Sequence, residues 1–506
     1  MKVSANNLIV FLIALLLGVG CEKNPEEVVN PNDNQTEQPG GNPLEEEVNP
    51  LESIRSIPTA LYYVTTDGKP LIVDSSNSMY DNLENNEYRD GVGRLTFKHK
   101  VYIIPWHAFE NQKRLKYVLF PRDLTTIEAS AFCGCENLKT ITISADVEYI
   151  GQNAFKDCTS LSDITILGSA IVDDVLRIGE CAFAGCEGTL TINRRSMVEK
   201  EKNVNVSPSE SSLWQKDSQL DIVIGDNITK IAPYAFASCN GIKSVTLGEN
   251  VTSIGGAAFR GCSNLTDVVL GDKITFIGME AFNRCSNLKS IDVPKGVTSI
   301  PYKTFYGCTS LEKVTLQEDL TTIESYAFYN CASLASLTIP ESVITIEGCA
   351  FMGCEKLKSI NIPQGVTTIK GQLLCDCKSL ESITIPAGVT IIWEGAFSNC
   401  ESLVSVTIPE GVTLIGNNAF QKCRSLVSVT LPSTLSDLGG MAFYGCERLA
   451  SVYCKPIVPP TSQSGMFDNN AQGRKIYVPH GSEEAYKNPS TGLWWFYTND
   501  IVGYDF

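Results

Sequence analysis

Cysteine is the residue type in this chain with the most chemical potential. The sequence has 506 residues and 19 cysteines, enough for an array of metal sites or disulfides. The pairs Cys133/Cys135 and Cys375/Cys377 are separated by one residue, which is the wrong spacing for a C-x-x-C redox motif. Thirteen cysteines form one regular series: Cys135, Cys158, Cys186, Cys239, Cys262, Cys285, Cys308, Cys331, Cys354, Cys377, Cys400, Cys423 and Cys446.

Cysteines in a regular series would stack and point the same way, which is poor disulfide geometry. We therefore expect an internal ladder of small apolar side chains. A disulfide-linked or metal-binding array is the alternative.

Groups that could perform acid–base catalysis or bind a metal are few. The three histidines, His99, His107 and His480, lie near no cysteine or acidic cluster with metal-ligand spacing. A glycan hydrolase would need two carboxylates facing one cleft. The candidates in the repeated strand positions are Asp267 and Asp292, which we expect to face solvent on neighbouring units. The sequence predicts no catalytic residues, no metal and no cofactor.

The cysteines belong to a repeat that must position them. From Cys239 to Cys446 they recur every 23 residues, and a phenylalanine precedes each, with Leu374 as the one substitute. The unit reads C-x-x-L-x-x-[IV]-x-[IL]-P-x-x-[VL]-x-x-I-x-x-x-A-F-x-x, and earlier members bring the count to about fifteen units. A fixed period in this range indicates a solenoid.

One unit shows how the repeat would fold. In residues 400–422, Leu403, Val406 and Ile408 mark a short strand with one buried face, and Pro409 ends it. Val412 and Ile415 mark a second buried stretch. A single unit buries too little apolar surface to offset its ordering entropy, so the units must stack. The predicted fold class is a β-rich solenoid.

Phrases such as LVSVTIPEGVTLIGNNAFQKC (Leu403 to Cys423) resemble the BspA-like (treponemal-type) leucine-rich repeat family of bacterial surface proteins. The resemblance covers about residues 95–455. The cysteine here precedes the strand, whereas standard leucine-rich repeats carry Asn or Cys after it. The resemblance implies a secreted or surface-anchored protein, an adhesin in some members, and supplies no catalytic residues.

The N-terminus has the pattern of a targeting segment. Lys2 precedes an apolar run from Leu8 to Gly18, and we assign residues 1–20 to a signal peptide. Gly18-Val19-Gly20-Cys21 resembles a bacterial lipobox with Gly18 in place of the usual leucine, so Cys21 is the expected lipidation site. An ordinary secretory signal is the alternative. The acidic residues behind Cys21 resemble the signal that sends Bacteroidota lipoproteins to the outer face of the outer membrane.

The remaining segments differ from the repeat. Residues 21–50 are acidic, lack aromatic residues and are predicted to form a disordered tether. We expect an N-terminal β cap at 51–94, the leucine-rich repeat solenoid at 95–455, and a C-terminal cap at 456–506 with a strand and a helix within 476–487. The aromatic run Trp494 to Tyr497 should pack onto the last coil; a glycan site is the alternative. Residues 193–212 form a polar insertion. We interpret it as an insertion that the fold tolerates and that has no function; a functional loop is the alternative.

Threonine recurs at outward positions of the predicted main strand. The candidate binding surface comprises Thr315, Thr338, Thr384, Thr407 and Thr430. Threonine is also simply a good strand former, which is the alternative explanation. A net charge of −17 argues against nucleic acid as a partner.

These features predict a cell-surface lipoprotein that binds a host or microbial protein or glycan without catalysis. Its membrane contact would be through the lipid anchor only. The alternatives are a structural spacer and, less favoured, a glycan-active enzyme.

Overall fold

The computed structural model describes residues 49–506 apart from 73–77, 169–174, 180, 194–195 and 198–218. The chain divides into the units Met1–Val48 and Asn49–Phe506. The predicted signal peptide, Cys21 and nearly all of the acidic tether lie outside the described residues, as does most of the predicted insertion at 193–212. Among the described residues, no helix is long and apolar enough to span a bilayer.

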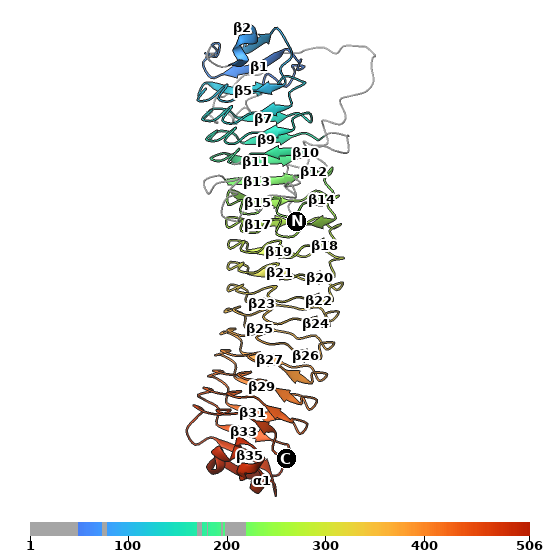
Figure 1. Ribbon diagram of the computed structural model, residues 1–506, viewed down its shortest axis with the longest axis vertical. Helices are drawn as coiled ribbons and strands as arrows, with labels where there is room; N and C mark the ends of the chain where they lie inside the picture. Colours follow the sequence, from blue (N-terminus) through green and yellow to red (C-terminus); the bar gives the residue numbers. More distant parts are fainter. Residues whose placement is uncertain (1–48, 73–77, 169–174, 180, 194–195, 198–218) are drawn as a thin grey trace, which may run out of the picture. The chain divides into compact units, whose positions relative to one another are not determined.

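The described residues between 49 and 506 fold as a β-solenoid in which each coil contributes two short strands, so the predicted fold class is confirmed (Figure 1). The first strand of each coil belongs to the main strand row, and the second belongs to the second strand row. The main strand row comprises β5 (Leu115–Leu119), β7 (Thr140–Ile143), β9 (Asp163–Ile166), β11 (Glu187–Ile192), β13 (Gln219–Ile224), β15 (Ile242–Thr246), β17 (Asp267–Val269), β19 (Ser290–Asp292), β21 (Lys313–Thr315), β23 (Ser336–Leu337), β25 (Ser359–Ile360), β27 (Ser382–Thr384), β29 (Ser405–Thr407), β31 (Ser428–Leu431), β33 (Ser451–Cys454) and β35 (Lys475–Pro479).

The second strand row consists mostly of two-residue strands. It comprises β4 (Ile103–Ile104), β6 (Thr126–Ile127), β8 (Tyr149–Ile150), β10 (Val175–Ile178), β12 (Ser196–Met197), β14 (Lys230–Ile231), β16 (Ser253–Ile254), β18 (Phe276–Ile277), β20 (Ser299–Ile300), β22 (Thr322–Ile323), β24 (Thr345–Ile346), β26 (Thr368–Ile369), β28 (Ile391–Ile392), β30 (Leu414–Ile415), β32 (Asp437–Leu438) and β34 (Thr461–Ser462). Pairing is parallel in both rows, and paired residues are one repeat apart, as in Ile291↔Val314 and Ile300↔Ile323.

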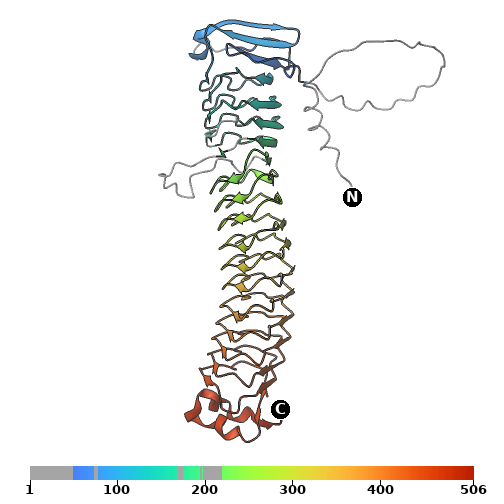
Figure 2. The same cartoon turned by 90° about the vertical axis from the view of Figure 1, so that its right-hand side faces the viewer.

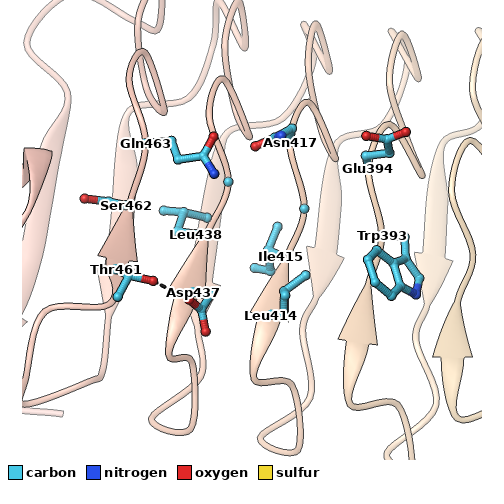
Figure 3. A pocket seen from close by; sticks show the side chains of 12 residues that line it. Trp393, Glu394, Leu414, Ile415, Asn417, Asp437, Leu438, Thr461, Ser462 and Gln463 are labelled. Carbon is cyan, nitrogen blue, oxygen red and sulfur yellow. Dashed lines mark hydrogen bonds between the residues drawn. The ribbon is translucent and has the colours of Figure 1, made fainter.

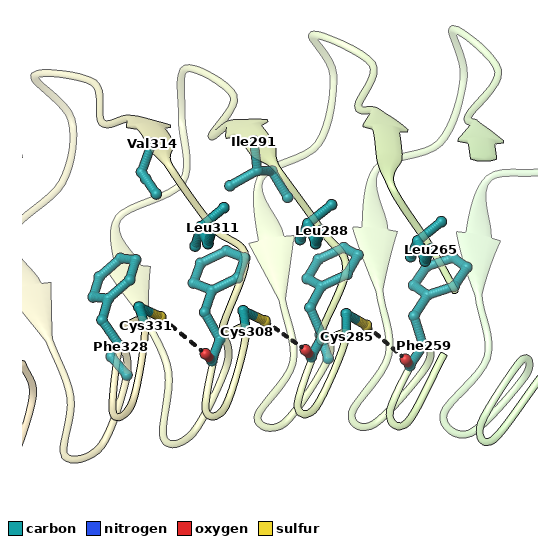
Figure 4. Close-up of a cluster of buried hydrophobic side chains, with 14 of the residues drawn as sticks. Phe259, Leu265, Cys285, Leu288, Ile291, Cys308, Leu311, Val314, Phe328 and Cys331 are labelled. Carbon is teal, nitrogen blue, oxygen red and sulfur yellow. Dashed lines mark hydrogen bonds between the residues drawn. The ribbon is translucent and has the colours of Figure 1, made fainter. Parts of the chain in front are cut away.

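Two ladders of side chains fill the interior between the rows. The phenylalanine rings stack coil on coil, with centroids 5.4 Å apart for Phe259/Phe282 and 5.7 Å apart for Phe282/Phe305. The series cysteines are buried free thiols, which confirms the ladder prediction and excludes the disulfide array among the described cysteines. Figure 4 shows the two ladders side by side beneath a layer of leucines such as Leu288.

The turn that carries the phenylalanine requires an unusual backbone conformation. The residue before the cysteine lies in the left-handed region, with φ of 70° at Gly307, 57° at Asn330 and 61° at Asp376. Glycine tolerates this region because it has no Cβ to meet the following carbonyl, and asparagine and aspartate tolerate it because their short polar side chains can hydrogen-bond to nearby backbone. The preference for small or Asx residues at this position therefore follows from the backbone.

An antiparallel sheet covers the N-terminal end of the solenoid (Figure 2). It is formed by β1 (Ala60–Thr65), β2 (Leu83–Arg89) and β3 (Val92–Phe97), and β1 pairs with β5 of the main strand row. The 3₁₀ helix η3 (Ser78–Asn82) places Tyr80 edge-on against Phe109, the first ring of the ladder. The expected domain boundary at residue 94 lies within β3.

The coil geometry continues beyond residue 455 at the C-terminal end. Phe467 stacks on Phe443 with centroids 5.6 Å apart, and β34 and β35 extend the two strand rows. The repeat pattern in the sequence does not identify this coil, because Phe467 follows Phe443 by one residue more than the period of 23 and Met466 replaces the usual alanine.

Short elements follow this last coil. They are α1 (Glu483–Lys487), η4 (Pro489–Thr491), η5 (Leu493–Asp500) and β36 (Ile501–Tyr504). The predicted strand and helix within 476–487 correspond to β35 and α1, and β36 pairs in parallel with β35.

Candidate functional site

The outward face of the main strand row carries the predicted threonines. Thr338, Thr384, Thr407 and Thr430 are exposed, and their side chains make no hydrogen bond in the structure. Thr315 is half-buried, and its hydroxyl donates to Asp292 Oδ1 at 2.5 Å. We call the four exposed residues the hydroxyl surface; their side chains are available to a partner, and that of Thr315 is occupied.

Threonines elsewhere in the coil have a different role. The Thr252, Thr321 and Thr413 hydroxyls each donate to the carbonyl of the equivalent residue one coil earlier, at 3.0, 3.0 and 3.3 Å. These hydroxyls tie adjacent coils together before the second strand. Hydrogen bonds between adjacent coils therefore explain the threonines that precede the second strand. They do not explain the four threonines of the hydroxyl surface, whose hydroxyls make no such bond.

The hydroxyl surface borders a hollow of about 530 Å³, lined by both polar and apolar residues, between β23, β25 and β27. Thr338 and Thr384 lie on its two sides, and Asn361 stands between them in the threonine position of the intervening coil. The Asn361 amide donates to the Ile339 carbonyl at 2.7 Å and accepts from the Ile339 N–H at 2.8 Å. The Asn361 side chain thereby takes the place of a strand neighbour in bonding the Ile339 backbone. The sequence analysis did not predict this role for Asn361.

The two carboxylates considered for catalysis do not form a pair. Asp267 pairs in register with Ser290, whereas Asp292 pairs with Thr315, so the two lie at different positions along the strands. Asp267 accepts a hydrogen bond from the Thr266 hydroxyl at 2.6 Å, and each carboxylate thus has a hydroxyl partner of its own. Within the described ranges, no cluster of three or more His, Cys, Asp or Glu could hold a metal ion.

The C-terminal aromatic run divides into a buried and an exposed pair. Trp494 is fully buried, donates from Nε1 to the Pro460 carbonyl at 2.8 Å and packs against Phe467, and Tyr497 is also buried. Trp495 and Phe496 stack on each other and are 38% and 61% exposed. The packing prediction is confirmed for Trp494 and Tyr497 and is wrong for Phe496 and much of Trp495, because residues three apart share one face of the 3₁₀ helix η5 and the two rings between them point away from the core.

A second hollow, of about 350 Å³, lies on the second strand row between β28 and β34 (Figure 3). The Trp393 indole, 44% exposed, stands at one end, and Asp437 and Thr461 lie toward the other. Hydrogen bonds from the Ser436 and Thr461 hydroxyls lower the pKa of Asp437, which favours its ionised form. Sequence reasoning missed this hollow; the available signal was a tryptophan in a position where many coils carry glycine.

The coils, with their consensus leucines and parallel strand rows, define a leucine-rich-repeat solenoid, a class whose members are typically non-catalytic. The family model described as "BspA type Leucine rich repeat region (6 copies)" matches residues 88–203, 209–335, 275–403, 321–450 and 371–488. The chain belongs to this BspA-type leucine-rich repeat family, as the sequence predicted. Proteins of the family are generally found at the cell surface.

Two solved structures are similar to this chain. A leucine-rich repeat protein from Bacteroides ovatus is 25% identical, with a TM-score of 0.50, over 77% of this chain and 95% of that one. A leucine-rich cell surface protein from Faecalibacterium prausnitzii is 27% identical, with a TM-score of 0.37, over 54% of this chain and 86% of that one. No curated protein matches the chain.

Proposed function

We propose that the protein is a non-catalytic adhesion module that binds a protein or a glycan polymer on host or microbial surfaces. The observation that carries this proposal is the hydroxyl surface, in which exposed threonines recur along the main strand row with free side chains. A long partner could contact many coils at once. Individually weak contacts would add up over that length, and affinity would stay modest without a buried anchor.

The proposal includes a location. Lipidation of Cys21 would anchor the protein in the outer membrane, and the acidic segment 21–50 would hold the solenoid away from the bilayer on the exterior. The surface location general in the family supports this reading. The net charge of −17 disfavours nucleic acid and anionic lipid headgroups as ligands.

The test is an isosteric change of the hydroxyl surface. A variant with Thr338→Val, Thr384→Val, Thr407→Val and Thr430→Val keeps β-branched side chains on the strands and removes the four hydroxyls. It should lose binding to whichever purified matrix protein or mucin glycan the unchanged protein retains in a solid-phase assay. The matched Thr→Ser variant keeps the hydroxyls and should bind normally.

Three results would redirect the proposal. If the valine variant binds as well as the unchanged protein, the hydroxyl surface is not the contact. If the unchanged protein binds none of the purified surface ligands, the structural-spacer alternative is favoured. Hydrolysis of a glycan during the assay would support the enzyme alternative.

A further inference from the structure

The hollow beside Trp393 has a shape that the repeat does not require. Trp393 follows β28 at a position where the next two coils carry Gly416 and Gly439. A Cβ atom at Gly416 would lie 2.6 Å from the Glu394 backbone nitrogen, so the close approach of the coils keeps this position free of a side chain. The indole therefore stands alone beside an open strip of backbone, and its face is accessible along the hollow (Figure 3).

The polar side chains around the hollow form a row parallel to this strip. Glu394, Asn417 and Gln463 lie at similar height in Figure 3, each from a different coil. Asn417 Oδ1 accepts a hydrogen bond from the Gly440 N–H at 2.7 Å, which orients the amide and leaves its Nδ2 group as a donor. The Glu394 and Gln463 side chains have no partner in the structure. The row thus offers an acceptor, a donor, and an amide that can serve as either.

The charge of the lining determines which ligands it can take. Among the twelve lining residues, Glu394 and Asp437 are acidic and none is basic. Phosphates, sulfates and uronic acids would be repelled from this surface. A cationic group would be attracted, but the hollow presents one aromatic face and no aromatic cage, and Asp437 already accepts hydrogen bonds from Ser436 and Thr461.

From this geometry we propose that the Trp393 hollow is a binding site for a neutral carbohydrate chain. A sugar ring has an apolar C–H face, which packs on an indole, and a rim of hydroxyls that both donate and accept. The hollow pairs one exposed indole face with a row of planar donors and acceptors, which matches both properties. Its volume of about 350 Å³ lies within the range of ligand sites, roughly 300–1,000 Å³. The site lies on the second strand row and does not rest on the hydroxyl surface.

The experiment measures binding of defined oligosaccharides to the full chain, purified in a detergent without a sugar headgroup. The probes are the neutral hexaoses of glucose, xylose and mannose, a galacturonate hexamer, and choline, each titrated by calorimetry. At least one neutral hexaose should bind, with an affinity at least tenfold above those of galacturonate and choline. Trp393→Ala should weaken that binding at least tenfold, whereas Trp393→Phe should retain most of it.

Further variants guard against misfolding and against a nonspecific effect. Trp393→Lys places at this position the residue that Lys370 supplies one coil earlier, so it is compatible with the fold and should also abolish binding. Gln463→Ala should weaken binding with no change in thermal stability. Phe276→Ala removes an exposed aromatic ring of β18, distant in the row, and should have no effect.

The outcomes decide between the ligands and the two surfaces. Absence of binding to all neutral hexaoses, or binding that survives both Trp393→Ala and Trp393→Lys, overturns the proposal. Preferential binding of choline would replace it with a cation site. The fourfold Thr→Val variant should bind the hexaose unchanged, so the failure of one surface can be distinguished from the failure of the other.

Discussion

The Sγ atom of Cys308 lies 3.2 Å from the carbonyl oxygen of Phe282, and the thiol donates a hydrogen bond to it. The same bond joins Cys285 to Phe259 and Cys331 to Phe305, in each case across 26 residues of sequence (Figure 4). Each cysteine therefore adds a second hydrogen bond to a carbonyl in the turn of the preceding coil, because that carbonyl also accepts a backbone N–H, as Phe282 does from Cys285 at 3.1 Å. The cysteine ladder therefore links adjacent coils by hydrogen bonds in addition to filling the core.

Burial should protect these thiols from reagents. In the native protein, a small thiol reagent should modify half-buried Cys133 first and leave the ladder cysteines largely unreacted. In guanidinium without reductant, the count should reach 18, because 19 cysteines less the lipidated Cys21 leaves 18. A substantially lower count would reveal disulfides and contradict the free ladder.

The ladder should also make the protein sensitive to alkali. Burial raises the pKa of Cys262, Cys308 and Cys354 to about 12, whereas an unfolded cysteine titrates near ~8.5. Since the folded pKa is the higher one, the unfolded state loses protons first as the pH rises. The stabilising contribution is complete below about pH 8.5 and falls by up to ~1.4 kcal/mol per thiol per pH unit until about pH 12.

Urea denaturation followed by circular dichroism between pH 7 and 11 measures this loss. Tyrosines and lysines titrate in the same range, so a control is required. A triple variant, Cys262→Ala, Cys308→Ala and Cys354→Ala, should be less stable at pH 7 but should lose stability less steeply above pH 9. Equal slopes for the two proteins would contradict the thiol explanation.

The repeat made the core predictable from sequence alone. The cysteine and phenylalanine positions, such as Cys308 and Phe305, follow from the period, and the structure buries both. The carbonyl bond of the thiol was not predictable, because it depends on the turn backbone and not on the spacing. The last coil was missed for a related reason: a one-residue insertion before Phe467 shifts the pattern, while the ring still reaches its stacking position.

The candidate sites were predictable only where they follow the repeat. Thr338 and Thr384 could be placed on the outward face because strand side chains alternate. Asn361 and Trp393 differ from the residues that neighbouring repeats carry at the same positions. The repeat pattern identifies such exceptions but does not predict their structural effect. The Asn361 amide replaces strand hydrogen bonds, and the Trp393 ring leaves a hollow beside it.

The C-terminal aromatic residues offer a matched pair for testing the cap. Trp494→Ala should destabilise the C-terminal end by about 3–5 kcal/mol, because it removes a fully buried ring and its hydrogen bond to Pro460. Trp495→Ala removes a partly exposed ring and should cost well under ~1 kcal/mol. Hydrogen exchange of β35 and β36 in the two variants measures the difference, and similar exchange rates would contradict a capping role for Trp494.

Lipidation can be tested independently of any ligand. Cys21→Ser should stop metabolic labelling with palmitate and shift the protein from the membrane to the soluble fraction. Cys133→Ser, which changes a cysteine of the solenoid, should leave labelling unchanged. Persistent labelling of the Cys21→Ser protein would contradict the lipobox reading and favour another attachment.

The register of the coils predicts that a whole unit can be removed. Deleting residues 308–330 joins Gly307 to Cys331, and the next coil then takes the place of the deleted one. Cys331 would donate to the Phe282 carbonyl in place of Cys308, and Phe351 would stack on Phe305 in place of the deleted Phe328, so both ladders stay continuous. Stability should fall only slightly, because each coil contacts mainly its neighbours.

A partial deletion provides the control. Removing residues 308–319 takes out the first strand of the coil but leaves the second, so every later side chain in that coil is displaced and polar residues enter the core. This variant should unfold at a far lower urea concentration and expose ladder thiols to reagent. The thiol count in native buffer separates the two: near that of the unchanged protein for the whole-unit deletion, and raised by several cysteines for the partial one. If both deletions unfold alike, the coils do not act as interchangeable units, and longer-range contacts must hold the solenoid together.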